Sequence, residues 1–255
     1  MPNALIIVKK RMDELHLPFA ALAAGELRNK GYDVNVFDAS AAAGEVLKYH
    51  IQQSNPDYLV TFDCAGFDLR LMGGDLFYNS LCCPASHVLF QAPDEYGDSL
   101  GMRMNFTMDF YVFTDEDVEY IQNNFERVPY VYRFGQYQAA PDCMGREIAV
   151  YVDGDTSEIN LKIAETLSAF GIGYCVCGEN WKRISGATVI LPHDPNYLEK
   201  QQIFSKCGVV ISTEVGSLRE KSVENTIIDM AGARRLNLSK WDYGLFLKLL
   251  KEKIQ

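Results

Sequence analysis

Acidic side chains with the chemistry of a general base lie close to the end of a predicted strand in the first half of the chain. Asp94 and Glu95 follow the apolar run 87–90 after only a few residues. A carboxylate at the end of a strand of a parallel sheet is placed to take the proton of an acceptor hydroxyl. Adjacent acids close to a glycine also form solvated turns. Asp94 is therefore a candidate catalytic base, with a solvated turn as the alternative.

A glycine in the second half lies where a phosphate group could bind. Gly154 belongs to the segment 153–157, which connects an apolar run to an amphipathic one. Glycine permits a tight turn, and the free N–H groups at the start of a helix bind phosphate. Neither a GxGxxG nor a GxxxxGK[ST] motif is present, and Asp153 and Asp155 would repel a phosphate. Gly154 is thus a candidate ligand-binding residue by position rather than by motif.

A second group of polar residues follows the apolar run that contains Cys175 and Cys177. It consists of Glu179, Asn180 and Trp181. The indole of Trp181 has two uses at this place, because it can stack on a base or a sugar or cover the rim of the core. We include all three residues among the candidates for substrate binding.

Hydroxyl and acidic side chains end the apolar run 208–212. Thr213 and Glu214 come directly after it, and Ser217 and Arg219 lead into the next amphipathic stretch. Hydroxyls, a helix start and a guanidinium are able to hold a diphosphate, with Arg219 as its counter-charge. Helix capping with an exposed arginine is the alternative. These four residues complete the predicted substrate-binding set.

The histidines and cysteines do not have the spacing of a metal site. The four histidines show no HxxxH or HxH pattern, and the seven cysteines include no CxxC pair. Cys175 and Cys177 share one face of a predicted strand, so we expect them to be buried core thiols. We therefore predict no metal and no cofactor. The sequence also lacks a Gly-x-Ser-x-Gly elbow, which argues against an acyl-transfer hydrolase.

The composition is that of a globular protein. The chain of 255 residues is 48 % hydrophobic and 23 % charged, and its net charge is −10. We expect no nucleic-acid partner, because binding to phosphate backbones is driven by a basic field. The apolar stretches are too short to cross a bilayer, and the scattered cysteines are typical of reduced thiols. These features predict a cytoplasmic protein without a transmembrane segment.

Alternating strand and helix signals position the candidate residues. We predict an α/β fold with two Rossmann-like open parallel sheets that face each other across a cleft. The first domain covers residues 1–134, a polar linker covers 135–145, and the second domain covers 146–255. The predicted strands are 4–8, 33–38, 58–63, 87–90, 109–113, 128–133, 147–152, 173–177, 187–191 and 208–212. The predicted helices are 18–30, 45–53, 115–125, a segment after Asp155, 197–207, 218–230 and a C-terminal helix.

Four helix ends carry capping signals. An N-cap residue followed three positions later by an acid is typical of a helix start, and a glycine after the last turn is typical of a helix end. The predicted starts are Thr114 with Asp117, Asp155 with Glu158 and Ser239 with Asp242, and the predicted end is Gly31.

The segments 56–67, 78–84 and 87–90, with Tyr120 and the Gly135 that follows Tyr-Arg-Phe, form a pattern of strand ends. Together with 113–115, 178–181 and 197–211 in the rest of the chain, this pattern resembles the CgeB-type (spore maturation protein) glycosyltransferase-like proteins. The resemblance covers most of the chain. It implies the GT-B arrangement of two Rossmann-like domains, with the acceptor on the first and a nucleotide-sugar held mainly by the second.

One segment departs from the family pattern. Such proteins carry an Arg-x-Phe-Glu-like segment before a small-residue glycine, and its acid binds the donor ribose. Counting back from Gly232, Glu224 takes the place of the arginine and Ile227 that of the acid. Since Ile227 cannot accept a hydrogen bond, we predict weakened donor binding unless Glu224 or Glu220 contacts the ribose instead.

The resemblance implies two functions from different classes. In the first, the protein transfers a sugar from a nucleotide-sugar to an unknown sugar or protein acceptor, with Asp94 as the base. In the second, it is an inactive glycosyltransferase-like module that binds a ligand or a protein partner. The polar strand ends favour the first function, and the isoleucine at position 227 favours the second.

Overall fold

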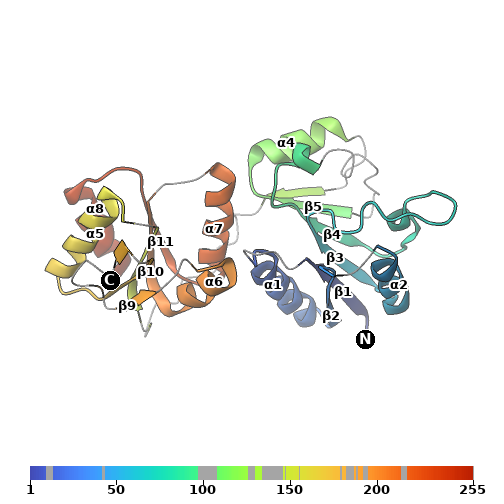
Figure 1. The fold of residues 1–255 in the computed structure, drawn as a ribbon, viewed down its shortest axis with the longest axis horizontal. Coiled ribbons are helices and arrows are strands. Elements are labelled where there is room, and N and C mark those ends of the chain that lie inside the picture. Colours follow the sequence, from blue (N-terminus) through green and yellow to red (C-terminus); the bar gives the residue numbers. More distant parts are fainter. Residues whose placement is uncertain are drawn as a thin grey trace. The chain divides into compact units, whose positions relative to one another are not determined.

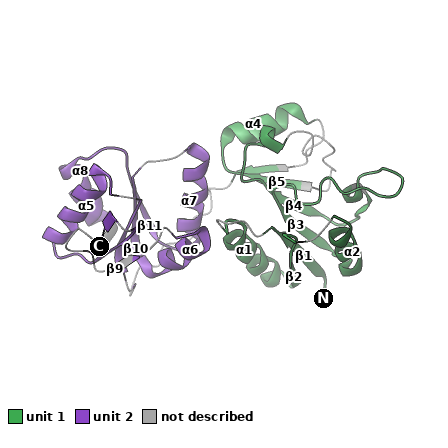
Figure 2. Cartoon of the chain, in the orientation of Figure 1, with its two compact units in different colours: residues 1–136 green, residues 137–255 purple. Residues whose placement is uncertain are grey.

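The chain forms two compact units, residues Met1–Gln136 (unit 1) and Tyr137–Gln255 (unit 2) (Figure 2). The computed structural model describes residues 1–9, 14–41, 44–96, 108–125, 130–133, 146, 148–154, 156–178, 180–181, 187, 189–191, 195–213 and 217–254. The linker predicted at 135–145 lies outside the described residues.

Unit 1 is built on a six-stranded parallel sheet in the order β2-β1-β3-β4-β5-β6 (Figure 1). Its strands are β1 (Asn3–Val8), β2 (Asp33–Asp38), β3 (Tyr58–Phe62), β4 (Ala85–Val88), β5 (Met108–Val112) and β6 (Tyr130–Arg133). Its helices are α1 (His16–Asn29), α2 (Gly44–Ser54), α4 (Asp115–Asn124) and two 3-10 helices, η1 (Phe77–Ser80) and η2 (Pro93–Tyr96).

Different helices pack on the two faces of this sheet. On one face, Leu47 and Ile51 of α2 and Ile121 of α4 join a core with side chains of β1, β3 and β5. On the other face, Phe19 of α1 packs edge-on against Phe90, which lies just beyond β4. Burial on both faces explains why β1 and β3 are continuous apolar runs rather than alternating ones.

Unit 2 has a five-stranded parallel sheet in the order β11-β10-β7-β8-β9. Leu167 of α5 and Phe246 of α8 pack on one of its faces, and Phe204 of α6 packs against Tyr151 on the other. The strands are β7 (Ile148–Asp153), β8 (Tyr174–Cys177), β9 (Val189–Leu191), β10 (Cys207–Thr213) and β11 (Arg234–Leu238). The helices are α5 (Glu158–Ala169), α6 (Tyr197–Lys206), α7 (Leu218–Met230) and α8 (Tyr243–Ile254).

Each sheet has one place where the order of strands reverses. In unit 1 the chain passes from β1 to β2 on one side and then to β3 on the other side of β1. In unit 2 it passes from β7 outward through β8 and β9, and then returns to β10 on the opposite side of β7. At such a switch point the connections leave in opposite directions, so a crevice opens at the carboxyl ends of the two strands.

The predicted α/β class with two open parallel sheets is confirmed. One strand, β11, has no counterpart among the predicted strands, because Arg234, Arg235 and Asn237 interrupt its apolar pattern. The strand predicted at 87–90 is found at Ala85–Val88. Phe90 therefore lies beyond the strand, where it stacks on the ring of His16.

The predicted caps agree with the structure at two helix ends and differ at two. Thr114 accepts a hydrogen bond from the Asp117 N–H, and Gly31 has a φ of +88° after the end of α1. Helix α5 is capped by Ser157 rather than by the predicted Asp155, which lies outside the described residues. Asp242 rather than Ser239 accepts the N–H of Leu245 at the start of α8. In both corrections the cap lies nearer to the first helical residue, where its oxygen reaches the free N–H groups.

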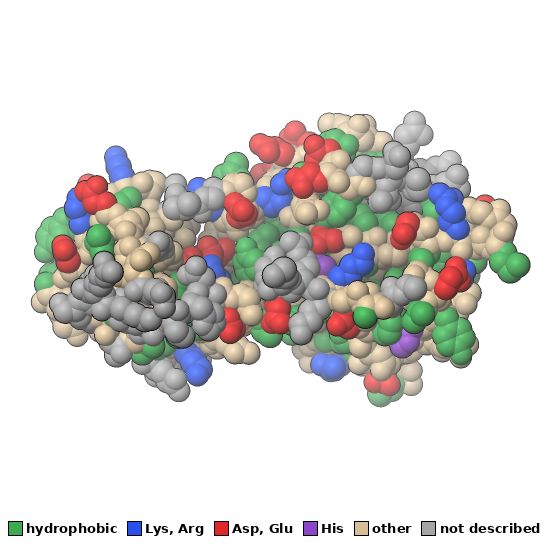
Figure 3. Space-filling view, in the orientation of Figure 1, with side chains coloured by type: hydrophobic (Ala, Val, Ile, Leu, Met, Phe, Trp, Pro, Cys, Tyr) green, Lys and Arg blue, Asp and Glu red, His purple; other side chains and the backbone are tan. Residues whose placement is uncertain are grey.

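Acidic side chains gather over α4 in the space-filling view (Figure 3). The first turn of this helix holds Asp115, Glu116 and Asp117. Negative side chains are favourable at a helix N-terminus because they interact with the positive end of the helix dipole. None of the described helices is long and apolar enough to span a membrane.

Candidate functional site

A cavity of about 470 Å³ lies at the carboxyl ends of β7 and β10 in unit 2, and we call it the switch-point pocket. Its position is the one at which open α/β sheets bind ligands, and its volume is in the range of small-molecule sites. Most of its lining side chains are polar or charged. They are Asp153, Gly154, Ser157, Asn160, Tyr197, Lys200, Ser212, Thr213, Glu220, Lys221 and Glu224.

Asn160 connects the two strands that form the pocket. Its amide donates to the backbone oxygen of Asp153 at 3.2 Å, and its Oδ1 accepts from the Thr213 hydroxyl at 3.0 Å. The side chain of Asn160 is buried, so these bonds form away from water. Gly154 turns the chain beside it with a φ of +95°, and a Cβ there would lie 3.3 Å from Asn160 Nδ2. A larger residue at 154 would strain this junction.

Lys200 enters the pocket from α6 and pairs with two carboxylates. Its Nζ lies 2.5 Å from Glu224 Oε1 on α7 and 3.4 Å from Asp153 Oδ1 at the end of β7. The side chains of Lys200, Glu224 and Asp153 are 20 %, 17 % and 12 % exposed. The ion pairs therefore form in a partly dehydrated place, where charges interact more strongly than at the surface.

The pKa values of Lys200 and Glu224 differ from their ordinary values for connected reasons. Burial raises the pKa of Glu224 to about 7, and the negative charge of Asp153 adds to this effect, while Lys200 opposes it. Burial alone would lower the pKa of Lys200, but its two carboxylate partners outweigh burial and raise the pKa. Lys200 is therefore a fixed cation, and Glu224 is the group that changes charge near neutral pH.

Two of the predicted substrate-binding residues line the switch-point pocket. These are Gly154 and Thr213. Ser217 is instead the N-cap of α7, because its hydroxyl accepts the Glu220 N–H at 3.2 Å and its own N–H donates to the Glu220 carboxylate. Arg219 follows in the first turn of α7 and is not part of the lining. Helix capping thus accounts for the position of Ser217.

Trp181 is a core residue, which is the second of the two uses predicted for its indole. Its side chain is fully buried, and its indole N–H donates to the backbone oxygen of Gly154 at 3.3 Å. A ring enclosed on both faces has no surface for a base or a sugar. Asn180 is exposed and does not line the pocket. Glu179 and Glu214 lie outside the described residues.

Sequence reasoning had not chosen Asn160, Tyr197 or Lys200 as site residues. Asn160 and Lys200 lie inside helices, where polar residues are common on solvent-facing surfaces. Glu224 and Glu220, which the sequence offers only as replacements for a missing ribose contact, both line the pocket. The signal for Asn160 is its place three residues after the Ser157 cap, in the first turn of the helix that follows β7.

Asp94 lies in unit 1, in the 3-10 helix η2, and is exposed. It lines neither the switch-point pocket nor a second cavity, which lies in unit 1. The same region contains a different acid with many partners, Asp63, at the end of β3. Asp63 Oδ2 accepts from His16 Nε2 at 2.8 Å, and Oδ1 accepts from the Phe90 N–H at 3.0 Å and from the Tyr96 hydroxyl.

The environment of Asp63 fixes several loops at the switch point of unit 1. Since His16 Nδ1 accepts the N–H of Lys9, the ring proton lies on Nε2 and points at the carboxylate. Burial alone would raise the pKa of Asp63, but the hydrogen bonds that it accepts outweigh burial and lower the pKa. Asp63 and Cys64 also have φ values of +48° and +54°, a conformation rare outside glycine.

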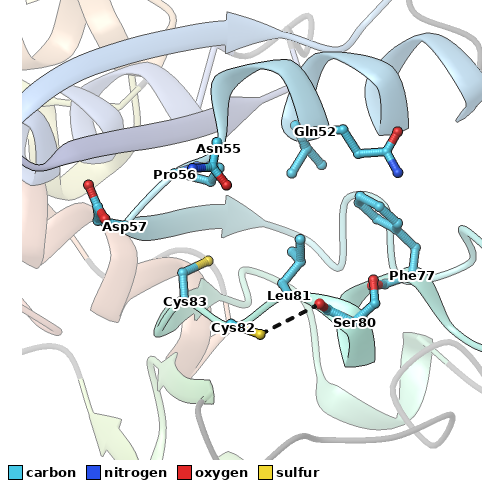
Figure 4. A pocket seen from close by; sticks show the side chains of 10 residues that line it. Gln52, Asn55, Pro56, Asp57, Phe77, Ser80, Leu81, Cys82 and Cys83 are labelled. Carbon is cyan, nitrogen blue, oxygen red and sulfur yellow. Dashed lines mark hydrogen bonds between the residues drawn. The ribbon is translucent and has the colours of Figure 1, made fainter.

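A second cavity, of about 460 Å³, lies in unit 1 at the amino ends of β3 and β4. It lies between the end of α2 and the segment that leads into β4. Figure 4 shows Cys83 and Asn55 directed toward each other across it, while Cys82 points to Ser80. Among the described residues no group of three or more His, Cys, Asp or Glu side chains is arranged to hold a metal ion.

The sequence matches no family model, and no curated protein matches it. Solved structures do match in fold. An α-glucosyltransferase in complex with UDP-glucose and DNA containing an abasic site is 9 % identical, with a TM-score of 0.49 over 92 % of this chain and 79 % of that one. The E. coli heptosyltransferase WaaC with ADP-2-deoxy-2-fluoro heptose is 14 % identical, with a TM-score of 0.46 over 94 % and 91 %. MurG of Acinetobacter baumannii is 10 % identical, with a TM-score of 0.39 over 100 % and 91 %.

Proposed function

We propose that this chain is a glycosyltransferase-like protein whose second unit binds a nucleotide-sugar in the switch-point pocket. The observation that carries the proposal is the pocket itself, which lies at the carboxyl ends of β7 and β10 and is lined by carboxylates, hydroxyls and lysines. Such side chains suit a ligand with many hydroxyl groups. The sequence resemblance to CgeB-type proteins points to the same class of ligand.

Glu224 is the residue that we propose to accept hydrogen bonds from the donor. Ile227, three residues further along α7, is fully buried and cannot touch a ligand. Glu224 lies one helical turn before it and lines the pocket. A carboxylate that accepts ligand hydroxyls contributes about 1.5–3 kcal/mol for each charge-assisted bond. Hydrogen bonds to Glu224 thus compensate for part of the binding energy that is lost because position 227 is an isoleucine and not an acid.

For sugar transfer, unit 1 would supply the acceptor surface. We propose Asp94 as the base, because it is an exposed carboxylate close to the end of β4. An Asp94→Asn variant should lose transfer while it keeps donor binding. Asp75→Asn, which removes a charge from another exposed loop of unit 1, is the matched control and should keep both.

Binding without transfer is the second candidate, and the charge of the pocket favours it. Three acidic residues (Asp153, Glu220 and Glu224) and two lysines line the cavity, which leaves an excess of one negative charge when all three acids are ionised. Lys200 is already paired with two of the acids. A diphosphate would meet no net positive charge in this lining, so the leaving group of a transfer reaction would be poorly stabilised.

Calorimetry with UDP-glucose, ADP-glucose and GDP-mannose tests the proposed binding. We expect affinities roughly ten- to a hundredfold weaker than those of a site with an intact ribose acid. Glu224→Ala should weaken binding further, whereas Glu165→Ala, on the exposed face of α5, should not. Release of nucleoside diphosphate in the presence of acceptors then separates the enzyme from the binding module. If none of the three donors binds at millimolar concentration, the proposed function is wrong.

A further inference from the structure

Two carboxylates share one lysine at the switch-point pocket. Lys200 Nζ is 2.5 Å from Glu224 and 3.4 Å from Asp153, so the charge of Lys200 is divided unequally between them. Both carboxylates are less than one-fifth exposed. The negative charge of Asp153 opposes the ionisation of Glu224 in this partly dehydrated place.

Other charged groups near Glu224 do not compensate for the excess of acids over lysine around Lys200. Asp153 is the nearest acid on β7, and Lys200 is the cation on α6, where it also lies over the ring of Tyr197 at 5.9 Å. Arg235 of β11 pairs with Asp229, near the end of α7, at 3.1 Å. On α7 itself, Glu220 and Lys221 line the same pocket with opposite charges. Glu224 therefore faces one more acid than its lysine can neutralise.

We propose that binding of a nucleotide-sugar is coupled to the loss of a proton from Glu224, which makes this residue the specificity-determining acid of the pocket. This inference rests on the proposed function. On binding, the O–H bond of the Glu224 carboxyl breaks, its electron pair stays on the oxygen, and the proton passes to the buffer. The resulting carboxylate accepts hydroxyl groups of the ligand while Lys200 holds it in place.

The sign of the proton change depends on which part of the ligand lies beside Glu224. Hydroxyl groups that donate to the carboxylate stabilise its charged form, so a proton is released. A phosphate beside the same residue would disfavour the charged form, so a proton would be taken up. Because burial raises the pKa of Glu224 to about 7, either change is measurable close to neutral pH.

Calorimetry of UDP-glucose and uridine at pH 7 in two buffers, PIPES and Tris, measures the number of protons exchanged. The two buffers differ in their heats of ionisation, so the difference between the observed binding heats reports protons moved to or from the buffer. We expect release of about half a proton for each ligand bound, since a group with a pKa close to the pH is half protonated before binding.

Three variants assign this proton to Glu224. Glu224→Gln should bind with no proton exchange. Asp153→Asn removes the repelling charge, so Glu224 is already ionised and the release should fall below about a quarter of a proton. Glu165→Gln removes an acid from the exposed face of α5 and should leave the release unchanged. Thermal unfolding of each variant confirms that it is folded before it is titrated.

The outcomes separate this inference from the proposed function. Proton release that disappears in Glu224→Gln and persists in Glu165→Gln supports the inference. Binding without proton exchange, or with proton uptake, contradicts it and leaves nucleotide-sugar binding intact. Absence of binding by UDP-glucose, uridine and the other donors contradicts the proposed function, and the proton coupling is then rejected with it.

Discussion

Unit 1 and unit 2 each have a partly buried acid at the switch point of the sheet, and the pKa values of the two acids shift in opposite directions. Asp63 follows β3 at the switch point of unit 1, and its side chain is 13 % exposed. Glu224 lies at the switch point of unit 2 and is 17 % exposed. The pKa of Asp63 is lowered, whereas that of Glu224 is raised.

The difference between the two acids comes from their partners rather than from burial. Asp63 accepts hydrogen bonds from an imidazole, a phenol and a backbone N–H, and no second acid takes part in its pKa shift. Glu224 shares its one lysine with Asp153. An acid surrounded by donors is fully satisfied and stabilises the fold, while an acid beside a second acid keeps the capacity to respond to a ligand. We therefore expect the Asp63 site of unit 1 to be structural and the Glu224 site of unit 2 to be adjustable.

Removal of the Asp63 carboxylate should have the largest effect. Asp63→Ala leaves His16, Tyr96 and the Phe90 N–H without their acceptor, and we expect unit 1 to lose about 3–5 kcal/mol of stability. Urea unfolding, monitored by hydrogen exchange in each unit, measures this loss of stability. Glu224→Ala is the matched variant in unit 2 and should change stability by less than about 1 kcal/mol, because Lys200 keeps Asp153 as a partner. A loss below about 1 kcal/mol for Asp63→Ala would show that its network is not structural.

Acidification should change the stability of the two units in opposite directions. His87 of β4 is fully buried, its Nδ1 is bonded to Thr61, and its Nε2 has no hydrogen-bond partner among the described residues. Burial lowers the pKa of His87 to about 3, so only the unfolded chain binds a proton near pH 6.5. Unit 1 should lose up to about 1.4 kcal/mol for each pH unit as pH falls from 6.5.

The raised pKa of Glu224 has the reverse consequence in unit 2. The folded state binds the proton at higher pH than the unfolded state, so stability increases as pH falls from about 7 toward the ordinary value of 4.5. Hydrogen exchange at pH 7.0 and 5.5, corrected for intrinsic rates, compares the units within one chain. His87→Leu should reduce the acid sensitivity of unit 1 and leave unit 2 unchanged. Equal responses of both units would contradict the comparison.

A smaller loss is expected when the connection between the strands of unit 2 is removed. Asn160→Ala deletes the bonds to the Asp153 carbonyl and the Thr213 hydroxyl. These bonds are uncharged, so unit 2 should lose about 1–3 kcal/mol, less than unit 1 loses with Asp63→Ala. Thr213→Val removes one of the two bonds and should have about half the effect. Denaturant unfolding of the three proteins tests this order.

The smallest expected effect distinguishes a helix-capping role of Ser217 from a ligand-binding role. Ser217→Ala removes the N-cap of α7 and should cost about 1 kcal/mol of stability. Because the Ser217 hydroxyl caps the helix and does not line the pocket, the affinity for UDP-glucose should stay within about twofold of the original. A tenfold loss of affinity would show that Ser217 takes part in ligand binding.

The candidate site was predictable in its location but not in its composition. Parallel strands place their carboxyl ends at one edge, so Gly154 and Thr213 could be chosen from the sequence. Trp181 follows a strand in the same way, yet it is enclosed by the core. The difference depends on how the chain turns after the strand, which a short sequence window does not record.

Local interactions determined the strands, the helices and most of their ends. Apolar runs and helical spacing are properties of neighbouring residues, and they gave the α/β class with two parallel sheets. Edge strand β11 was not predicted, because Arg234 and Arg235 interrupt its apolar pattern. Only the tertiary structure brought Lys200 between Asp153 and Glu224, from three separate elements. Charge coupling depends on distance through space, and packing rather than sequence spacing sets that distance.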